Sequence, residues 1–396
     1  MLIEIIIFLF LGIFAGIFTG LAPGIHINLV GAVLVSTSLS LFTSLNPTYL
    51  VVFIVAMAIT HSFVDFVPSI FLGCPDAETS LSVLPGHKML REGKGYEAVM
   101  LVNYGAILGI FVLIVIFIPA IFIIPKIYGF VEKIIPHLLV LMLIFMVFSE
   151  KEKFPAALVL FVSGALGLIV LNFDSLNEPL LPLLTGLFGA STLILSINAK
   201  IKIPKQEITK PEEKLMMPLF GSVMASIFCG FLPGLGGGQA AVMGNLISKS
   251  GKKGFLILLG ATNVLVMGFS FVALYVISKT RTGAAAAVQE LIGIPNFNLM
   301  ILVMSVILIS GVASFFITEK FARIFSSEIG KINYSKLSFF ALLFISSVVL
   351  IFSGILGFVV FIISTLTGIY CISFGVRRTN MMGCLLIPTI FLYLLR

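Results

Sequence analysis

The chain has 396 residues, of which 59% are hydrophobic and 10% charged, and its mean hydropathy is +1.21. So little polar surface cannot cover a soluble globule of this size, which excludes soluble enzymes, secreted disulfide scaffolds, disordered regulators and nucleic-acid binders. The net charge of +7 therefore indicates basic cytoplasmic loops rather than a nucleic-acid partner. The composition predicts an all-α, multi-pass protein of the cell membrane, with lipid as its solvent.

The cysteines and the N-terminus are unremarkable for a protein of this class. Cys74, Cys229, Cys371 and Cys384 have no paired spacing and lie in apolar stretches, so they predict neither a disulfide framework nor a metal site, and we expect no cofactor. The first apolar helix carries Glu4 but no Lys or Arg. Because a cleavable signal peptide has a basic start, we expect this helix to be retained.

Ten segments are candidates to cross the bilayer, which takes about 20 apolar residues. In the first half they are residues 48–66, 98–124, 134–149, 154–171 and 179–198, and in the second half 254–278, 298–317, 336–352, 355–374 and 381–395. Two further apolar pairs, 3–22 with 25–45 and 216–232 with 238–248, are interrupted by Pro-Gly. We expect each pair to form a helical hairpin, so that hairpins cover 3–45 and 216–248.

The two Pro-Gly interruptions repeat each other. Residues 17–24 and 227–234 share Ile, Phe, Gly, Pro and Gly in register, 210 residues apart. A fainter echo pairs the Thr-His at 60–61 with the Thr-Asn at 262–263. These matches indicate an internal duplication.

A polar, turn-rich stretch follows each echo, at residues 68–86 and 278–293. Each stretch is expected to be a broken, re-entrant segment. The sequence therefore predicts two repeats, 1–198 and 216–396, joined by a cytoplasmic linker at 199–215. Each repeat has a broken hairpin, about five spans and a re-entrant segment.

Loop charge predicts the orientation. Of the 24 Lys and Arg residues, 19 lie in six loops at 87–97, 150–153, 199–215, 249–253, 319–336 and 375–380. All six are cytoplasmic if the chain begins outside and each hairpin returns to its own side. An odd number of spans per half then inverts the second repeat relative to the first. Inverted repeats with broken helices are the architecture of secondary transporters.

The second interruption is rich in glycine at the expected membrane depth. Four glycines fall within residues 234–238, and backbone unwound there must be satisfied by something other than lipid. The amides of a helix beginning near Gly238 would turn its positive end toward an anion. The predicted substrate-binding residues here are Pro233, Gly234, Gly236, Gly237, Gly238 and Gln239, with Asn263 from the echo. The alternative is that the glycines only let two helices pack around a kink.

The first interruption carries hydrogen-bonding side chains instead. His26 and Asn28 follow Pro23 and Gly24 in an otherwise apolar context, and polar groups at that depth usually face a cavity or a partner. We expect these four residues to bind substrate, and His26 to bind it or relay a proton. A satisfied structural histidine is the alternative.

Two further pairs are candidates for ion coupling or anion pairing. His61 and Asp65 lie four apart, on one helical face, and either close a helix end or couple an ion, H⁺ or Na⁺. Lys279 and Arg281 lie in the second broken stretch. They either anchor that loop or pair with an anionic substrate.

The chain resembles a shortened form of the large membrane subunit of the tripartite tricarboxylate transporters, the TctA-type permeases. The resemblance rests on the two Gly-x-x-Pro-Gly breaks, on Pro85-Gly86 with the basic loop that follows, and on residues 260–263, Gly-Ala-Thr-Asn. It covers most of the chain. It implies a secondary transporter that imports carboxylates with an ion gradient, together with a small membrane subunit and an extracytoplasmic binding protein.

Other functions are open at this point. The paired Pro-Gly hairpins also resemble the polyprenyl-phosphate transporters, in which a Gly-rich tip would face a lipid phosphate. An intramembrane protease or prenyl transferase would need paired or clustered aspartates, whereas the intramembrane acids here are scattered. A structural scaffold would leave the unwound glycines without a purpose. The sequence therefore favours a permease for a small organic anion, probed best by substrate-dependent flux in proteoliposomes.

Overall fold

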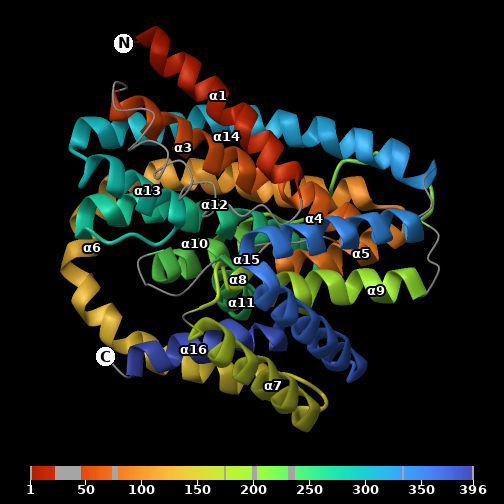
Figure 1. Ribbon diagram of the computed structural model, residues 1–396. Helices are drawn as coiled ribbons and strands as arrows, with labels where there is room; N and C mark the ends of the chain where they lie inside the picture. The colour runs from red at the N-terminus through yellow and green to blue at the C-terminus, as the bar shows by residue number, and fades with distance from the viewer. Residues whose placement is uncertain are drawn as a thin grey trace.

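The computed structural model describes residues 2–22, 46–73, 79–173, 175–198, 203–230, 237–331 and 334–394. All regular secondary structure in those ranges is helical (Figure 1). The first half contains α1 (Leu2–Leu21), α3 (Pro47–Val64), α4 (Phe66–Leu72), η1 (Ser80–Ser82), α5 (Val83–Arg91), α6 (Gly95–Phe148), α7 (Lys153–Leu171), α8 (Leu180–Leu184), the π-helix η2 (Thr185–Ala190) and α9 (Ser191–Asn198). The second half contains α10 (Met216–Gly230), α11 (Gly237–Ser248), α12 (Lys252–Ile277), α13 (Gly283–Ile292), α14 (Phe297–Glu328), η3 (Ile329–Lys331), α15 (Tyr334–Ser373), η4 (Arg378–Met382) and α16 (Gly383–Leu394).

The helices are those of a multi-pass membrane protein. Within the described residues, seven helical segments are long and apolar enough to cross a bilayer: α1, α3 continued by α4, α6, α7, α12, α14 and α15. Large apolar side chains such as Phe14, Phe122 and Ile355 are exposed on their outer faces. An apolar exterior of this kind is stable when it faces lipid rather than water.

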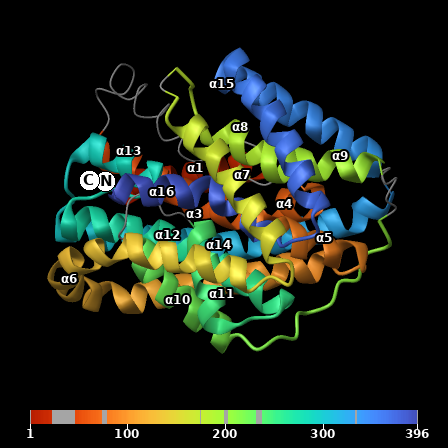
Figure 2. The same ribbon diagram turned by 90° about the horizontal axis from the view of Figure 1, so that it is seen from below.

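Two helices differ from the others because the protein encloses them. The apolar window of α3 and that of α12 are each 94% buried, whereas those of α1 and α6 are 28% and 33% buried. Helix α3 packs against α1 and α14, and α12 packs against α6 and α10; Figures 1 and 2 show both helices within the bundle. Both central helices follow a predicted hairpin, one in each half of the chain, which is consistent with a duplication.

Glycines set the spacing of the bundle around these central helices. A Cβ on Gly105 would meet the carbonyl oxygen of Ile257, and a Cβ on Gly260 would meet that of Val102. Backbone-to-backbone contact of this kind brings α6 and α12 together without the hydrophobic effect, which does not act between helices in lipid.

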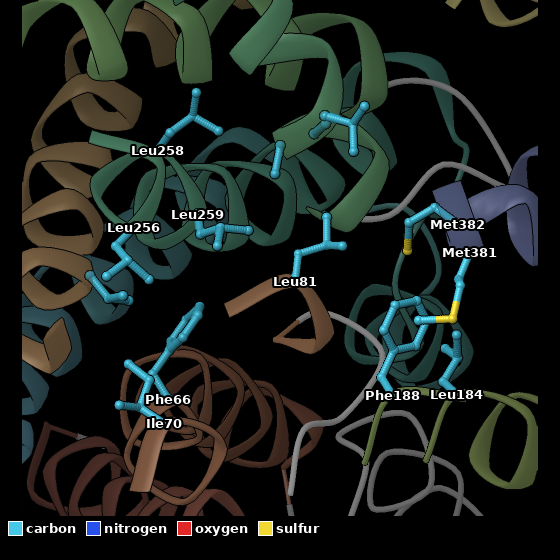
Figure 3. Close-up of a cluster of buried hydrophobic side chains, with 14 of the residues drawn as sticks. Phe66, Ile70, Leu81, Leu184, Phe188, Leu256, Leu258, Leu259, Met381 and Met382 are labelled. Atoms are coloured by element: carbon cyan, nitrogen blue, oxygen red, sulfur yellow. The ribbon is translucent and has the colours of Figure 1, made fainter. Parts of the chain in front are cut away.

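A large apolar cluster fills the space between the helices on one side of α12. Figure 3 shows Phe66 and Ile70 of α4, Leu81 of η1, and Leu256 and Leu259 of α12 as parts of this cluster. The cluster extends to Leu184, Phe188, Met381 and Met382. It therefore joins α4 of the first half to α12 and η4 of the second.

Helices α10 and α11 flank the second Pro-Gly interruption, whose residues 231–236 lie outside the described part of the chain. The two helices pack closely, because a Cβ on Gly221 would lie 2.5 Å from the carbonyl oxygen of Gly244. The predicted break between residues 352 and 355 is confirmed, since Gly354 has φ 66° inside α15. Helix α15 bends in Figure 1.

Two predictions about helix ends were wrong. Spans 98–124 and 134–149 are one helix, α6, which contains Pro119, Pro125 and Pro136 and bends in Figure 1. Proline removes one backbone donor and bends a helix, but the hydrogen bonds resume on either side. The stretch 278–293 is not turn-rich throughout, because Thr282 caps α13 by accepting from the amide of Ala285.

The basic loops contact one another at one side of the molecule. Lys253 forms an ion pair with Glu97 at 2.5 Å. Gln206 accepts from the amide of Gly95 at 2.8 Å and donates to the carbonyl of Leu90 at 3.0 Å. Further contacts join Tyr96 to Glu319 and Gly330 to Lys205. Loops 87–97, 199–215, 249–253 and 319–336 therefore lie together at one side. Arg377 pairs with Glu150, which joins the remaining loops, 375–380 and 150–153, to each other.

We predict that this side is cytoplasmic, as the positive-inside rule requires. A cysteine at Lys210, which is exposed, should react with a membrane-impermeant thiol reagent only after permeabilisation, while one at the exposed Ser175 should react in intact cells. Gln206 is unsuitable for this labelling because its side chain is buried. Labelling of Lys210→Cys from outside intact cells would refute the orientation.

We also predict that the contact between α6 and α12 is too close for a side chain larger than that of glycine at position 105. Gly105→Ala should lower the free energy of unfolding by about 1–3 kcal/mol, because its Cβ would overlap the carbonyl of Ile257. Gly129→Ala is the matched control in the same helix: no heavy atom lies within 4 Å of its Cβ position, so it should be neutral or stabilising. Thermal unfolding of the detergent-solubilised protein measures both, and equal unfolding midpoints for the two variants would contradict the proposed close contact.

Candidate functional site

The helix before the first Pro-Gly break lies directly on α3. Gly12, Gly16 and Gly20 recur every fourth residue along one face of α1, and Cβ atoms on the first two would lie 2.5 Å and 2.6 Å from backbone carbonyl oxygens of α3. A Cβ on Gly20 would lie 3.2 Å from the amide nitrogen of Asp65. The last turn of α1, just before Pro23, is therefore held against the polar end of α3.

That contact brings together the first group of polar side chains. Nδ1 of His61 lies 3.1 Å from Oγ1 of Thr19, and Nε2 of His61 lies 3.9 Å from Oδ2 of Asp65. All three residues are buried. The prediction that His61 and Asp65 share a helical face is confirmed.

Asn263 of the second half joins this group of polar side chains. This residue lies on α12, is 2% exposed, and donates from Nδ2 to the carbonyl of Ser62 at 3.2 Å. The two echoed motifs, at 60–61 and 262–263, thus meet at the contact between α3 and α12. Thr60 also accepts a hydrogen bond from Ser314 of α14, at 3.0 Å.

Asn263 faces the start of α11. A Cβ built on Gly237 would lie 3.5 Å from Cα and 3.6 Å from Oδ1 of Asn263. Oδ1 accepts no hydrogen bond from the described residues. Gly237 and Gly238 are buried in the first turn of α11, where helix amides have no partner within the helix.

The glycine at 237 differs from a larger residue in its size and not in its backbone conformation. Gly237 is helical and is absent from the glycines with positive φ, so it does not supply a left-handed conformation. Its small size instead leaves space in front of Asn263.

Arg281 holds the other side of the second break. Its Nε and Nη2 donate to the carbonyl of Cys229 at 3.2 Å and 2.7 Å, and its amide donates to Ser270 at 3.1 Å. A Cβ on Gly230 would lie 2.6 Å from Cβ of Phe269. The end of α10 and the start of α11 are therefore fixed against α12, two turns apart.

Lys279 takes a different position from Arg281. It is exposed, donates to the hydroxyl of Tyr128 at 2.7 Å and lies 4.6 Å from the centre of that ring. The structure thus places Lys279 at the surface and Arg281 beside the break.

Several predicted binding residues lie outside the described part of the chain. These are Pro23, Gly24, His26, Asn28, Pro233, Gly234 and Gly236, together with the side chain of Gln239. Within the described residues, no cluster of three or more His, Cys, Asp or Glu has the arrangement of a metal site.

Sequence reasoning missed Thr19, Ser62 and Ser314. Each forms its contact across two elements. The glycine spacing of α1 was a usable signal for Thr19, because it identifies the face that contacts α3. No sequence signal identifies the other two.

The comparisons with known proteins agree with this architecture. The family model described as "Tripartite tricarboxylate transporter TctA family" matches residues 6–383. The chain belongs to this family. It is therefore a transporter rather than an enzyme.

One curated relative covers nearly the whole chain. The uncharacterized protein MJ1079 of Methanocaldococcus jannaschii is 33% identical over 402 residues, which is 99% of each chain. No solved structure matches the chain. The TctA match extends across both interruptions and both central helices, so the site described above lies within the family's common region.

We predict that Arg281 positions the break. Arg281→Gln should lower the free energy of unfolding by about 1–3 kcal/mol, because the buried carbonyl of Cys229 loses two charged donors. Lys279→Gln, which removes a surface cation two residues away, is the control and should have a smaller effect. Thermal unfolding in detergent checks the pair. Equal effects of the two substitutions would show that Arg281 does not hold α10.

Proposed function

We propose that the protein is the permease of a secondary transporter for a small organic anion, a carboxylate, and that the substrate binds between the two Pro-Gly breaks. The family has transport as its function. Beyond transport, we propose that the substrate is a carboxylate, that an ion gradient drives its uptake, and that the residues named above bind it.

One observation carries the position of the site. The described flanks of both breaks converge on one contact between the central helices: Gly20 of α1 lies against Asp65, and Gly237 of α11 lies against Asn263. Asn263 also bonds to α3. A substrate bound beside this contact would touch both halves of the chain, as alternating access requires.

The chemistry of the second break favours an anion. The first turn of α11 presents amides and the positive end of the helix dipole. Arg281 adds a guanidinium at the end of α10. A carboxylate takes hydrogen bonds from both kinds of donor.

The same chemistry also fits the phosphate of a polyprenyl lipid, so the assay must separate the two. The TctA match favours the carboxylate. By the same resemblance, we propose that the permease resides in the plasma membrane and works with a small membrane subunit and an extracytoplasmic binding protein.

Transport in proteoliposomes tests the proposal. Purified protein should exchange external radiolabelled citrate or succinate for the same unlabelled acid inside. Vesicles without protein are the first control, and a polyprenyl phosphate added as competitor is the second. If the protein exchanged neither acid but the lipid phosphate raised its thermal unfolding temperature, the substrate would be the lipid phosphate and not a carboxylate.

We predict that the space in front of Asn263 is needed for binding. Gly237→Val should raise the KM for exchange about tenfold or more, because its methyl groups would fill the gap to Oδ1. Gly237→Ala should have a smaller effect, since its Cβ makes ordinary contacts at 3.5 Å.

Gly251→Val is the matched control for this series. Gly251 precedes α12, has extended backbone and has no heavy atom within 4 Å of its Cβ position. A normal KM in Gly237→Val would show that the substrate does not need this space. A raised KM in Gly251→Val as well would show that the effect of Gly237→Val comes from folding.

A further inference from the structure

The side-chain amide of Asn263 is fixed in one orientation. Asn263 lies on α12, is 2% exposed, and its amide contacts the backbone carbonyl of Ser62 at 3.2 Å. A carbonyl oxygen can only accept a hydrogen bond, so the nitrogen of the amide must be the atom that faces it. The other end of the amide, the oxygen Oδ1, therefore faces away from Ser62.

Oδ1 of Asn263 lies beside the start of α11. Its distance to the position of a Cβ on Gly237 is 3.6 Å, and no group of the described residues donates a hydrogen bond to it. A buried amide oxygen without a donor is costly, because it has given up its hydrogen bonds to water. A ligand that supplies a donor at this point recovers that cost.

The first turn of α11 presents the opposite kind of group. Gly237 and Gly238 are buried there, and the amides of a first helical turn are donors with no partner inside the helix. Because a Cβ lies about 2.5 Å from the nitrogen of its own residue, the amide nitrogen of Gly237 is within about 6 Å of Oδ1 of Asn263. Donors that suit a carboxylate and an acceptor that suits a donor group therefore lie side by side.

We propose that the substrate is a carboxylate with a hydrogen-bond donor, a hydroxyl or an ammonium group, on the carbon next to the carboxylate, and that Oδ1 of Asn263 accepts from this donor. The inference rests on the proposed transport function and deepens it, because it names the class of carboxylate. The amides of α11 bind the carboxylate, and Asn263 selects the group beside it.

An acid without this donor binds less well for a physical reason. Its binding removes water from Oδ1 and offers no hydrogen bond in return, and a carboxylate oxygen placed there would bring one acceptor against another. A site built to hydrogen-bond a substrate's hydroxyl rejects the analogue that lacks it more strongly than an apolar pocket rejects a missing methylene. Asn263 therefore acts mainly by excluding unsubstituted acids.

The same amide connects this selection to both halves of the chain. Its Nδ2 holds α3 of the first half, and its Oδ1 faces α11 of the second. A substrate that donates to Oδ1 while its carboxylate accepts from the amides of α11 joins α11 to α12 at the point where α12 meets α3. An acid without the donor contacts α11 alone.

Exchange in proteoliposomes tests the selection with three acids of one carbon skeleton. Succinate, malate and aspartate differ only in carrying a hydrogen, a hydroxyl or an ammonium group on the second carbon. The wild type should have a KM for malate or aspartate at least about tenfold below that for succinate, and the better of the two identifies the donor. Exchange of all three acids with equal KM would overturn the selection and leave carboxylate transport in place.

Substitution of Asn263 tests the residue. In Asn263→Ala the KM for the preferred acid should rise at least about tenfold more than the KM for succinate, because only the preferred acid loses a hydrogen bond. The ratio of two KM values in one variant does not depend on the amount of folded protein, so general damage would not produce this change. An unchanged ratio in Asn263→Ala would overturn the role of Oδ1.

Asn103→Ala is the matched control. Asn103 of α6 is 1% exposed, its Nδ2 donates to the carbonyl of Phe315 at 2.9 Å, and its Oδ1 also has no donor among the described residues. This amide contacts α14 rather than α11, so Asn103→Ala should keep the preference of the wild type. Loss of the preference in both variants would attribute it to packing and overturn the proposal.

Binding in detergent separates the selection from transport. Malate or aspartate should raise the thermal unfolding temperature of the wild type at concentrations about tenfold below those that succinate requires, and this difference should be lost in Asn263→Ala and kept in Asn103→Ala. Such selective binding without exchange of any acid would overturn the transport function and support the role of Asn263. The absence of both selective binding and exchange would overturn both.

Discussion

Much of the structure depends on the enclosure of α3 and α12 by the rest of the chain. Both windows are 94% buried, yet these helices carry His61, Asp65 and Asn263. Neither lipid nor bulk water can satisfy polar groups there, so their partners must come from packed neighbours. The glycine faces of α1 and α6 make that possible, because they bring backbones close enough for short side chains such as Thr19 to reach across.

The main features of the fold could be predicted from the sequence because they follow from composition and local breaks. The apolar spans and the kink at Gly354 both have such local signals. The continuity of α6 could not be predicted, because its prolines and charged residues resemble those of a loop. The helix turns on either side of each proline nevertheless maintain the hydrogen bonding.

The candidate site was predictable only in part. The repeated Pro-Gly and the echo at residues 60–61 and 262–263 identified helices that the structure brings into contact, and the i,i+4 spacing identified one face of α3. Which residues meet across elements is a property of the packing. The bonds from Asn263 to Ser62 and from Arg281 to Cys229 join residues 201 and 52 apart in the chain, and no periodicity encodes them.

The same packing accounts for a difference between the two breaks. At the second break, Arg281 fixes the end of α10 and Asn263 faces the start of α11, so charged and polar groups come from outside the hairpin. At the first, α1 is fixed by its own glycines and by the hydroxyl of Thr19 against an ionisable pair. The neutral amide of Asn263 joins the two without adding a charge of its own.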